Sequence, residues 1–90
     1  MTLNHTAGNI KKWVVDYKRW LLPGEAILTQ SVVSSSTTLT VTNTLINLHK
    51  EVWFYLNGGV TGETPTITVT VTTSKGETKI DVFDVLVTSP

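Results

Sequence analysis

The stretch TITVTVT, residues 66–72, decides the fold because polar and apolar residues alternate along it without a break. Strict alternation is typical of a β-strand with one buried face and one exposed face. Further β-forming segments lie on both sides of it, at 51–56 and 79–87. A glycine-rich loop, 57–64, precedes it, and a turn containing Gly76, 73–77, follows it. The second half of the chain therefore predicts neighbouring strands in an antiparallel sheet.

The segment 51–56, EVWFYL, carries aromatic residues at alternate positions. We expect Val52, Phe54 and Leu56 to face inward, because this phase leaves the charge of Glu51 in water. Trp53 and Tyr55 then point outward as a pair, which is typical of a contact surface. The other interpretation is that a loop or the N-terminal segment covers the two aromatic side chains.

The remaining segments also predict strands, although two of them leave the inward face open. In 38–42 the alternation places Leu39 and Val41 inward, and Asn43-Thr44 predicts a turn before a shorter apolar segment. In 26–33 one face carries Ala26, Leu28 and Val32, and the other carries Ile27 and Val33. In 79–87 Ile80 and Val82 lie on one face, whereas Phe83, Val85 and Val87 lie on the other. Either a β-bulge near Phe83 or Asp84 reconciles them, or Ile80 and Val82 lie on the outer face.

The N-terminal part of the chain is poorer in apolar residues. We expect a flexible arm over 1–12, and a short edge strand at Trp13-Val14-Val15. Asp16 precedes a segment that we expect to form one short helical turn, with Asp16 as its cap and Pro23-Gly24 at its end. Together the segments predict an all-β antiparallel sandwich of about seven strands, as a single domain over 13–88.

Composition narrows the range of functions. The 90 residues include no cysteine, and seven basic residues balance seven acidic ones. No disulfide or thiolate metal site is therefore expected, and no nucleic-acid partner, because the chain has no basic stripe. No apolar segment approaches the length of a membrane span, so we expect no membrane contact.

The residues that carry out chemistry are also few. His5 and His49 are the only histidines, and no carboxylate pattern near them indicates a metal site. The glycine-rich loop lacks the Gly-Lys-Ser/Thr ending of a phosphate-binding loop. No nucleophile, acid and base converge in the pattern, so we expect no enzyme activity, no cofactor and no small-molecule substrate.

Several short motifs occur in a recognisable order. They are Asp16-Tyr17-Lys18-Arg19-Trp20-Leu21, Gly24-Glu25, Gly58-Gly59-Val60-Thr61-Gly62 and Thr72-Thr73-Ser74-Lys75-Gly76. Over residues 13–87 the chain resembles small immunoglobulin-like β-sandwich proteins encoded among the virion genes of tailed bacteriophages and prophages. In that family a tyrosine often starts the strand after the glycine loop, where this chain has Pro65. A loop contact anchored by tyrosine is therefore in doubt.

The resemblance implies a structural or adaptor protein of the virion, at a head–tail or tail–fibre junction, assembled in the cytoplasm of the bacterial host. Its partners would be other virion proteins, with self-association into a homo-oligomer as a further expectation. The alternative is a carbohydrate- or receptor-binding sandwich module. The expected interaction surface consists of Trp53, Tyr55, Asn57, Gly58, Gly59, Thr61 and Glu63.

Overall fold

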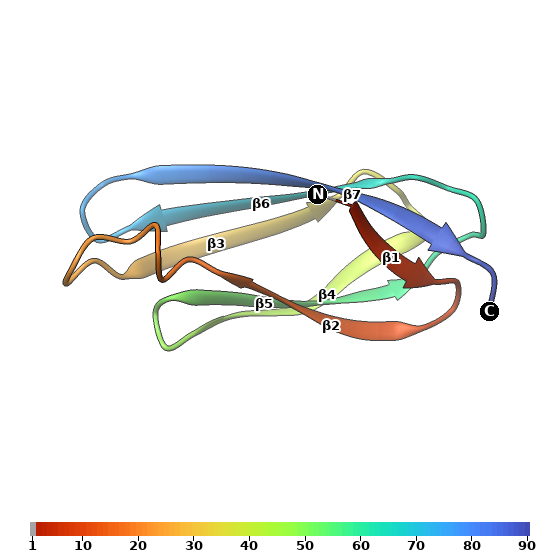
Figure 1. Cartoon of the computed structure of the whole chain (residues 1–90), viewed down its shortest axis with the longest axis horizontal. Helices are drawn as coiled ribbons and strands as arrows, with labels where there is room; N and C mark the ends of the chain where they lie inside the picture. The colour runs from red at the N-terminus through yellow and green to blue at the C-terminus, as the bar shows by residue number, and fades with distance from the viewer. Residues whose placement is uncertain (1) are drawn as a thin grey trace.

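The computed structural model describes residues 2–90, and within that range it contains seven β-strands and no helix. The strands are β1 (Thr2–Thr6), β2 (Ile10–Asp16), β3 (Ile27–Ser34), β4 (Leu39–Asn47), β5 (Glu51–Gly58), β6 (Thr66–Thr73) and β7 (Thr78–Thr88). They form a four-stranded sheet in the order β1-β7-β6-β3 and a three-stranded sheet in the order β2-β5-β4. Figure 1 shows the two sheets as stacked layers along the long axis of the molecule.

The strand order is that of an immunoglobulin-like sandwich. Constant-type immunoglobulin domains place strands A, B, E and D in one sheet and C, F and G in the other. Here β2, β5 and β4 take the places of B, E and D, and β3, β6 and β7 take those of C, F and G. The remaining strand, β1, lies parallel to β7 instead of beside β2. The predicted all-β sandwich is thus confirmed, and among residues 2–90 no strand occupies the place of strand A beside β2.

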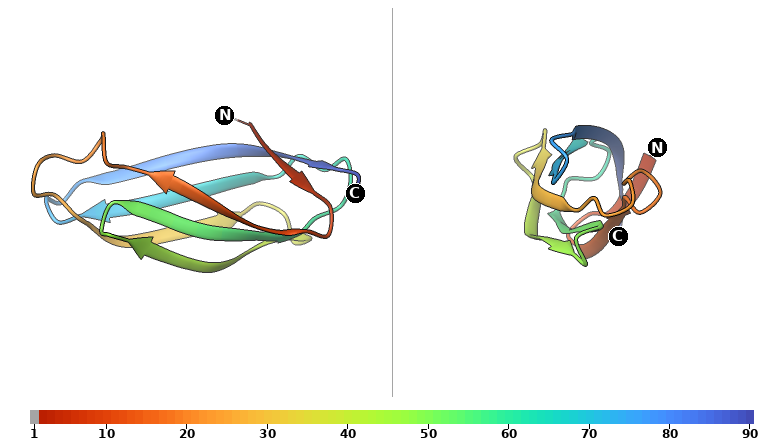
Figure 2. Two further views of the ribbon diagram at one scale, coloured as in Figure 1. Left: turned by 60° about the horizontal axis from the view of Figure 1, so that its bottom comes forward. Right: turned by 90° about the vertical axis from the view of Figure 1, so that its left-hand side faces the viewer.

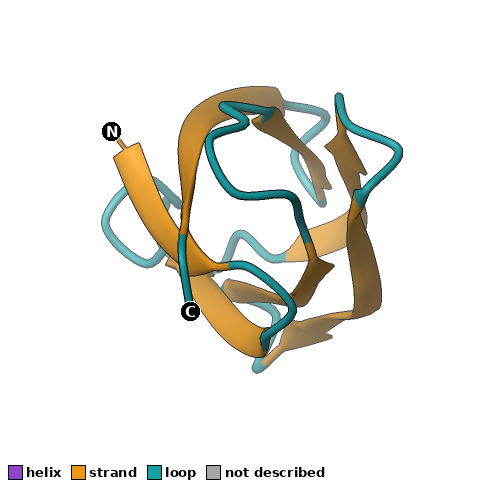
Figure 3. Ribbon diagram, turned by 90° about the vertical axis from the view of Figure 1, so that its right-hand side faces the viewer, coloured by secondary structure: helices purple, strands orange, loops and turns teal. Residues whose placement is uncertain are grey.

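The core lies between the two layers and is built from alternate residues of facing strands. Val52, Phe54 and Leu56 of β5 are at most 1% exposed, which confirms the predicted phase of that strand. Ile67, Val69 and Val71 of β6 meet them from the other sheet and are fully buried. Figure 3 and the right-hand view of Figure 2 look along the molecule and show the strands of the two sheets on opposite sides of it. The molecule measures 43 × 20 × 18 Å, so a narrow core runs along an elongated body.

The sequence left open which residues of two strands face inward, and the structure answers this first for β7. Its pairing with β6 runs without a shift from Thr78 to Asp84, so the expected alternative of a β-bulge near Phe83 is wrong. Ile80 and Val82 point outward and are 62% and 57% exposed. The inner face carries Asp81 instead, and its carboxylate accepts a hydrogen bond of 2.8 Å from the Tyr17 hydroxyl. A polar pair at the end of the core therefore replaces the apolar residue that a regular strand would place there.

In β3, the second strand whose inward face was left open, a β-bulge changes which residues face the core. The register with β6 shifts between Ile27 and Thr29, so Leu28 is the extra residue and is 61% exposed. The shift lets Ile27, which is 1% exposed, and Val32 both face the core although they differ in phase. Gln30 shares this inner face, and its Nε2 donates a hydrogen bond of 2.9 Å to the Thr44 hydroxyl of β4.

The N-terminal segment differs from the flexible arm that we expected over 1–12. Thr2–Thr6 form β1 in register with β7, residues 7–9 form a turn, and residues 10–12 belong to β2; residue 1 of that arm lies outside the described residues. Leu3 and His5 are 5% and 1% exposed, because the short strand covers the C-terminal half of β7. Two buried side chains in alternation anchor a segment whose composition is otherwise polar.

The short helical turn that we expected after Asp16 is not present. Residues 17–25 form a loop of turns, in which the Tyr17 carbonyl accepts bonds from the amides of Trp20 and Leu21. Asp16 binds the amide of Lys18 across two residues, as aspartate does in turns. The Glu25 carboxylate draws the chain back by accepting the Leu22 amide at 2.8 Å.

The predicted turn at Asn43-Thr44 is also absent, because β4 continues through these two residues. Asn43 adopts a positive φ of 52°, and the register with β5 shifts between Thr42 and Leu45. Asparagine tolerates this conformation better than most residues. A local irregularity inside one strand thus takes the place of a change of direction.

Candidate functional site

The two predicted aromatic residues lie on the outer face of the three-stranded sheet. Trp53 is flanked in register by Val14 of β2 and Leu45 of β4, and Tyr55 by Lys12 and Thr42. Val14 and Leu45 are 44% and 42% exposed, and both aromatic side chains are half-buried. We call Lys12, Val14, Leu45, Trp53 and Tyr55 the aromatic face. It is a continuous, partly apolar surface across the middle strand of the sheet.

Neighbouring polar groups hold Trp53 in one orientation. Lys12 Nζ lies 4.0 Å from the centroid of the Trp53 ring, within the range of a cation–π contact. The indole Nε1–H donates to Glu51 Oε1 at 3.1 Å. The expected alternative, cover by a loop or by the N-terminal segment, applies in part, because Lys12 and Val14 of β2 border the ring. The remaining ring surface faces outward and is already fixed in position.

The Glu51 carboxylate is the common partner of the polar groups around Trp53. It accepts a hydrogen bond of 2.8 Å from the side-chain Nδ2 of Asn47 and forms an ion pair with Lys18 Nζ at 3.4 Å. The pKa of Glu51 is held below its ordinary range, first by the hydrogen bond from Asn47 and then by that from Trp53. The charged form is thus the one that positions the indole.

Gly58 and Gly59 shape the end of the sandwich. Gly58, with φ of 87°, accepts hydrogen bonds on its carbonyl from His5 Nε2 and from the Gly8 amide, each at 3.0 Å. A Cβ on Gly58 would lie 2.8 Å from the Thr38 carbonyl oxygen. The amide of Gly59 donates to that same carbonyl at 2.9 Å. The two glycines therefore join three segments of backbone and present no side chain to a partner.

The rest of the predicted surface divides between two places. Asn57 is half-buried at the end of β5, opposite Ile10 and Thr40. Thr61 is exposed in the loop between β5 and β6. Glu63 turns inward and holds that loop to residues 36–38. The structure therefore brings Trp53 and Tyr55 together on the sheet, with Asn57 following along β5, and puts Thr61 and Glu63 in the loop at the end of the molecule.

Glu63 holds the loop between β5 and β6 against residues 36–38. Its carboxylate accepts hydrogen bonds from the hydroxyls of Ser36 and Thr38 at 2.9 Å and from the Val60 amide at 3.0 Å. The Val60 amide is the largest cause that lowers the pKa of Glu63. A shallow polar hollow lies beside Glu63, between residues 35–38 and 60–65.

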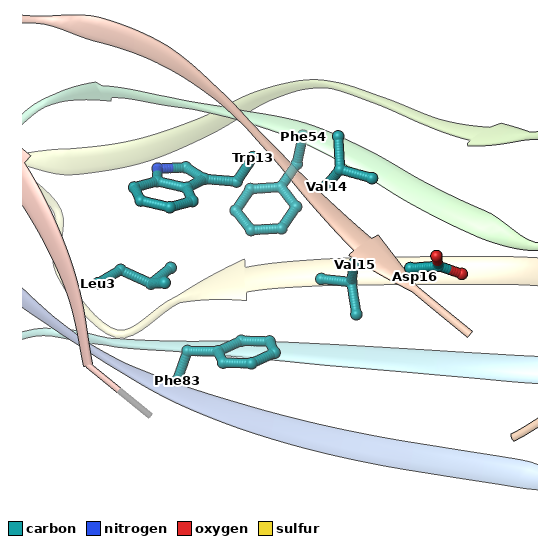
Figure 4. A pocket seen from close by; sticks show the side chains of 7 residues that line it. All are labelled: Leu3, Trp13, Val14, Val15, Asp16, Phe54 and Phe83. Atoms are coloured by element: carbon teal, nitrogen blue, oxygen red, sulfur yellow. The ribbon is translucent and has the colours of Figure 1, made fainter. Parts of the chain in front are cut away.

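One apolar groove went unrecognised in the sequence. It has a volume of about 200 Å³ and lies between the sheets, where β2 faces β7 (Figure 4). Its lining residues are Leu3, Trp13, Val14, Val15, Asp16, Phe54 and Phe83. The only signal in the sequence was the apolar run Trp13-Val14-Val15, which indicated an edge strand but no groove.

The residues described by the structure offer little to a metal or a membrane. In the range 2–90 no three histidine, cysteine, aspartate or glutamate side chains gather closely enough to hold a metal ion. Within the same range no helix has the length and apolar character needed to cross a membrane.

The geometry therefore defines a small immunoglobulin-like sandwich whose main features are an aromatic sheet face, glycine-shaped loops and free strand edges. Such features are typical of proteins that act through contacts with other proteins. A family model for the podophage GP4 fiber-tail adaptor protein gp77 matches residues 6–86, and the chain belongs to this family. No curated protein matches the chain. The chain is thus a structural adaptor of a bacteriophage virion, and the resemblance read from its motifs is confirmed.

Proposed function

We propose that the protein joins a tail fibre to the tail of a podophage particle, and that the aromatic face is one of its two contact surfaces. The proposal rests on the family match and on the position of Trp53. On this proposal the chain works by binding alone, without catalysis or a cofactor, and assembles into the virion in the host cytoplasm. An adaptor has to contact two neighbours, so a second surface is required as well.

The fixed orientation of Trp53 is the observation that carries the proposal. Tryptophan and tyrosine are enriched among the few residues that supply most of the binding energy of an interface. A ring already held by Lys12 and Glu51 loses little conformational entropy on binding. The alternative of a carbohydrate-binding module has less support, because Lys12 already occupies one side of the ring that a sugar would stack on.

Alanine substitution of Trp53 or Tyr55 tests the proposed surface. The protein would be titrated with the purified fibre and tail proteins of its own phage, using interferometry or calorimetry. We expect Trp53→Ala to weaken one of the two complexes by at least about tenfold, since truncation at a hot spot costs about 2 kcal/mol or more. Val33→Ala is the matched control, because Val33 is 57% exposed on the outer face of the other sheet. Unchanged affinity of both complexes in the Trp53→Ala variant would remove the aromatic face from the proposal.

A homo-oligomer belongs to the same proposal. Sedimentation velocity on the free protein, over a wide range of concentration, reports whether copies associate before they meet the fibre or the tail. A closed oligomer of fixed size would support a ring-like adaptor, because most protein oligomers have closed symmetry. A strict monomer would mean that the neighbouring virion proteins provide the template.

A further inference from the structure

The two long sides of the sandwich differ in how they are closed. On one side β3 and β4 lie together, and Gln30 bonds Thr44 across the sheets. On the other side β1 pairs with only 84–88 of β7. Among residues 2–90, no strand pairs with the edge of 78–83 that faces away from β6, or with the edge of β2 that faces away from β5. This side, visible where β2 passes in front of β7 in Figure 2, forms an open seam.

Both rims of the seam carry backbone groups without a strand partner. Antiparallel pairs alternate between bonded and non-bonded residues. The Gly58 amide bonds the Asn9 carbonyl and the Tyr17 amide bonds the Lys50 carbonyl, so the odd-numbered residues of β2 are the ones bonded to β5. The amides and carbonyls of the even-numbered residues of β2 therefore point along the sheet into the seam. These residues are Ile10, Lys12, Val14 and Asp16.

The same alternation applies to β7. The Thr73 amide bonds the Glu77 carbonyl, and counting on from this pair makes the odd-numbered residues of β7 the ones bonded to β6. Ile80 and Val82, which precede the residues paired with β1, therefore direct their backbone groups away from β6, toward the open side of their sheet. On the open side of the sandwich, each sheet thus ends in backbone donors and acceptors that have no strand partner among residues 2–90.

Apolar side chains line the gap between the rims. Trp13 and Val15 of β2, Phe83 of β7 and Leu3 of β1 converge on it, with Phe54 as its floor (Figure 4). The groove has a volume of about 200 Å³. It lies beside β2, in the position where strand A stands in an immunoglobulin domain.

We propose that the open seam accepts an extended strand from a partner virion protein, which pairs with β2 in the position of strand A. The inference rests on the proposed function and supplies the second contact surface that an adaptor needs. The incoming strand runs antiparallel to β2 and spans about five residues, or roughly 17 Å. Alternate apolar side chains of this strand fill the groove, and its backbone bonds the even-numbered residues of β2.

The charges at the two ends of β2 indicate which charged residues the added strand should carry. Lys11 lies at one end of the acceptor, and Asp16 lies at the other end. A strand antiparallel to β2 therefore matches it best with a basic residue near its beginning and an acidic residue near its end.

A strand fits the seam better than the other occupants do. A small apolar ligand would fill the groove but leave the backbone groups of Lys12 and Val14 bonded only to water. Two copies of this chain joined through their β2 edges would pair the backbone, but each groove would remain empty because the side chains of β2 stay in their own sandwich. A partner strand satisfies the backbone and the groove together.

Amide hydrogen exchange in the assembled complex tests the inference. The probes are the purified fibre and tail proteins of the same phage, and exchange is followed residue by residue with NMR or mass spectrometry. We expect the amides of Lys12, Val14 and Asp16 to slow by at least about 100-fold on assembly, because strand pairing protects them. A complex in which these amides exchange as fast as in the free protein would overturn the inference and leave the proposed function intact.

Proline substitution provides the second test. Val14→Pro removes an amide that points into the seam and no bond to β5, so the fold is kept, as is usual for proline on edge strands. We expect it to abolish one complex. The comparison variant Val14→Ala retains the amide and removes only the side chain from the aromatic face, so it should weaken binding by less than about tenfold. If Val14→Pro does not fold, the hydrogen-exchange measurement on the assembled complex decides between the outcomes.

Three other results would overturn the inference. One is normal assembly of the folded Val14→Pro variant. Another is protection of the even-numbered β2 amides by self-association alone, which would assign the seam to a second copy. Absence of any complex with the fibre or tail protein would overturn the inference and the proposed function together.

Discussion

Glu25 is a charged residue that the fold buries to 2% exposure. Its carboxylate accepts the Thr73 hydroxyl at 2.6 Å and the Leu22 amide at 2.8 Å, and so joins the loop after β2 to the end of β6. These bonds, that from Thr73 being the larger cause, lower the pKa of Glu25 from its ordinary value of 4.5. Glu51 and Glu63 have lowered pKa values for the same kind of reason. Each of these three carboxyl groups is ionised when it holds its loop or side chain in place.

We therefore predict that the protein loses stability in acid. A carboxyl whose folded pKa lies below its unfolded value contributes stability above the unfolded value, and this is lost as the pH falls through the folded pKa. The melting temperature should be level above about pH 5.5 and fall steadily as the pH drops below 4.5. Glu25→Gln should lower the melting temperature at neutral pH and flatten this decline, measured by circular dichroism. An equally steep decline in Glu25→Gln would show that other groups are responsible.

Gly58 provides a second prediction at the level of single residues. Gly58→Ala combines a positive φ with a Cβ that lies 2.8 Å from the Thr38 carbonyl oxygen, so the backbone has to shift. We expect a loss of about 2–3 kcal/mol in the free energy of unfolding, measured with urea. Gly62→Ala is the control, because Gly62 also has a positive φ but no neighbour within 4 Å of the added Cβ. Its cost should be about 1 kcal/mol, and equal losses in both variants would mean that the contact with Thr38 carries no penalty.

At the level of elements, the sequence predicted the strands whose burial alternates and failed where contacts distant in sequence decide. The pattern of β5 and β6 was sufficient because each strand has one buried face along its whole length. The bulge in β3 could not be located, because Ile27 and Val32 are out of phase by one residue and only the pairing with β6 shows where the extra residue lies. The groove at the seam was missed for a related reason, since it depends on how far β1 extends along β7.

Strand β1 is the clearest example of an element that the sequence did not predict, and it leads to a testable prediction. Leu3 is only 5% exposed, yet neither its neighbours nor its spacing marked it as part of a strand. We expect Leu3→Ala to reduce the free energy of unfolding by about 2–3 kcal/mol, as is typical of a large residue removed from a core. Asn4→Ala, in the same strand but exposed, should change it by less than about 0.5 kcal/mol. Similar small effects of both substitutions in urea titrations would favour the flexible arm over the strand.

At the level of the whole molecule, the sandwich is asymmetric about its core. One long side is closed by β3 and β4, and the opposite side is open between β2 and β7. The aromatic face lies on the outer surface of one sheet, whereas the outer surface of the other carries threonines of β6 between the exposed side chains of Val33 and Val82. The two proposed contacts adjoin along β2, whose side chains at Lys12 and Val14 belong to the aromatic face and whose backbone borders the seam.

The exposed row on the four-stranded sheet leads to a last prediction, on self-association. Ile80 and Val82 are more than half exposed, they border a free strand edge, and the chain has no net charge at pH 7 to keep copies apart. We expect weak association of the free protein that increases with concentration, and Ile80→Lys should abolish it. Thr78→Lys is the matched control, because it adds the same charge to β7 just before the apolar row and should leave association in place. Sedimentation velocity at neutral pH measures both, and equal loss of association in the two variants would assign the effect to net charge and not to the apolar row.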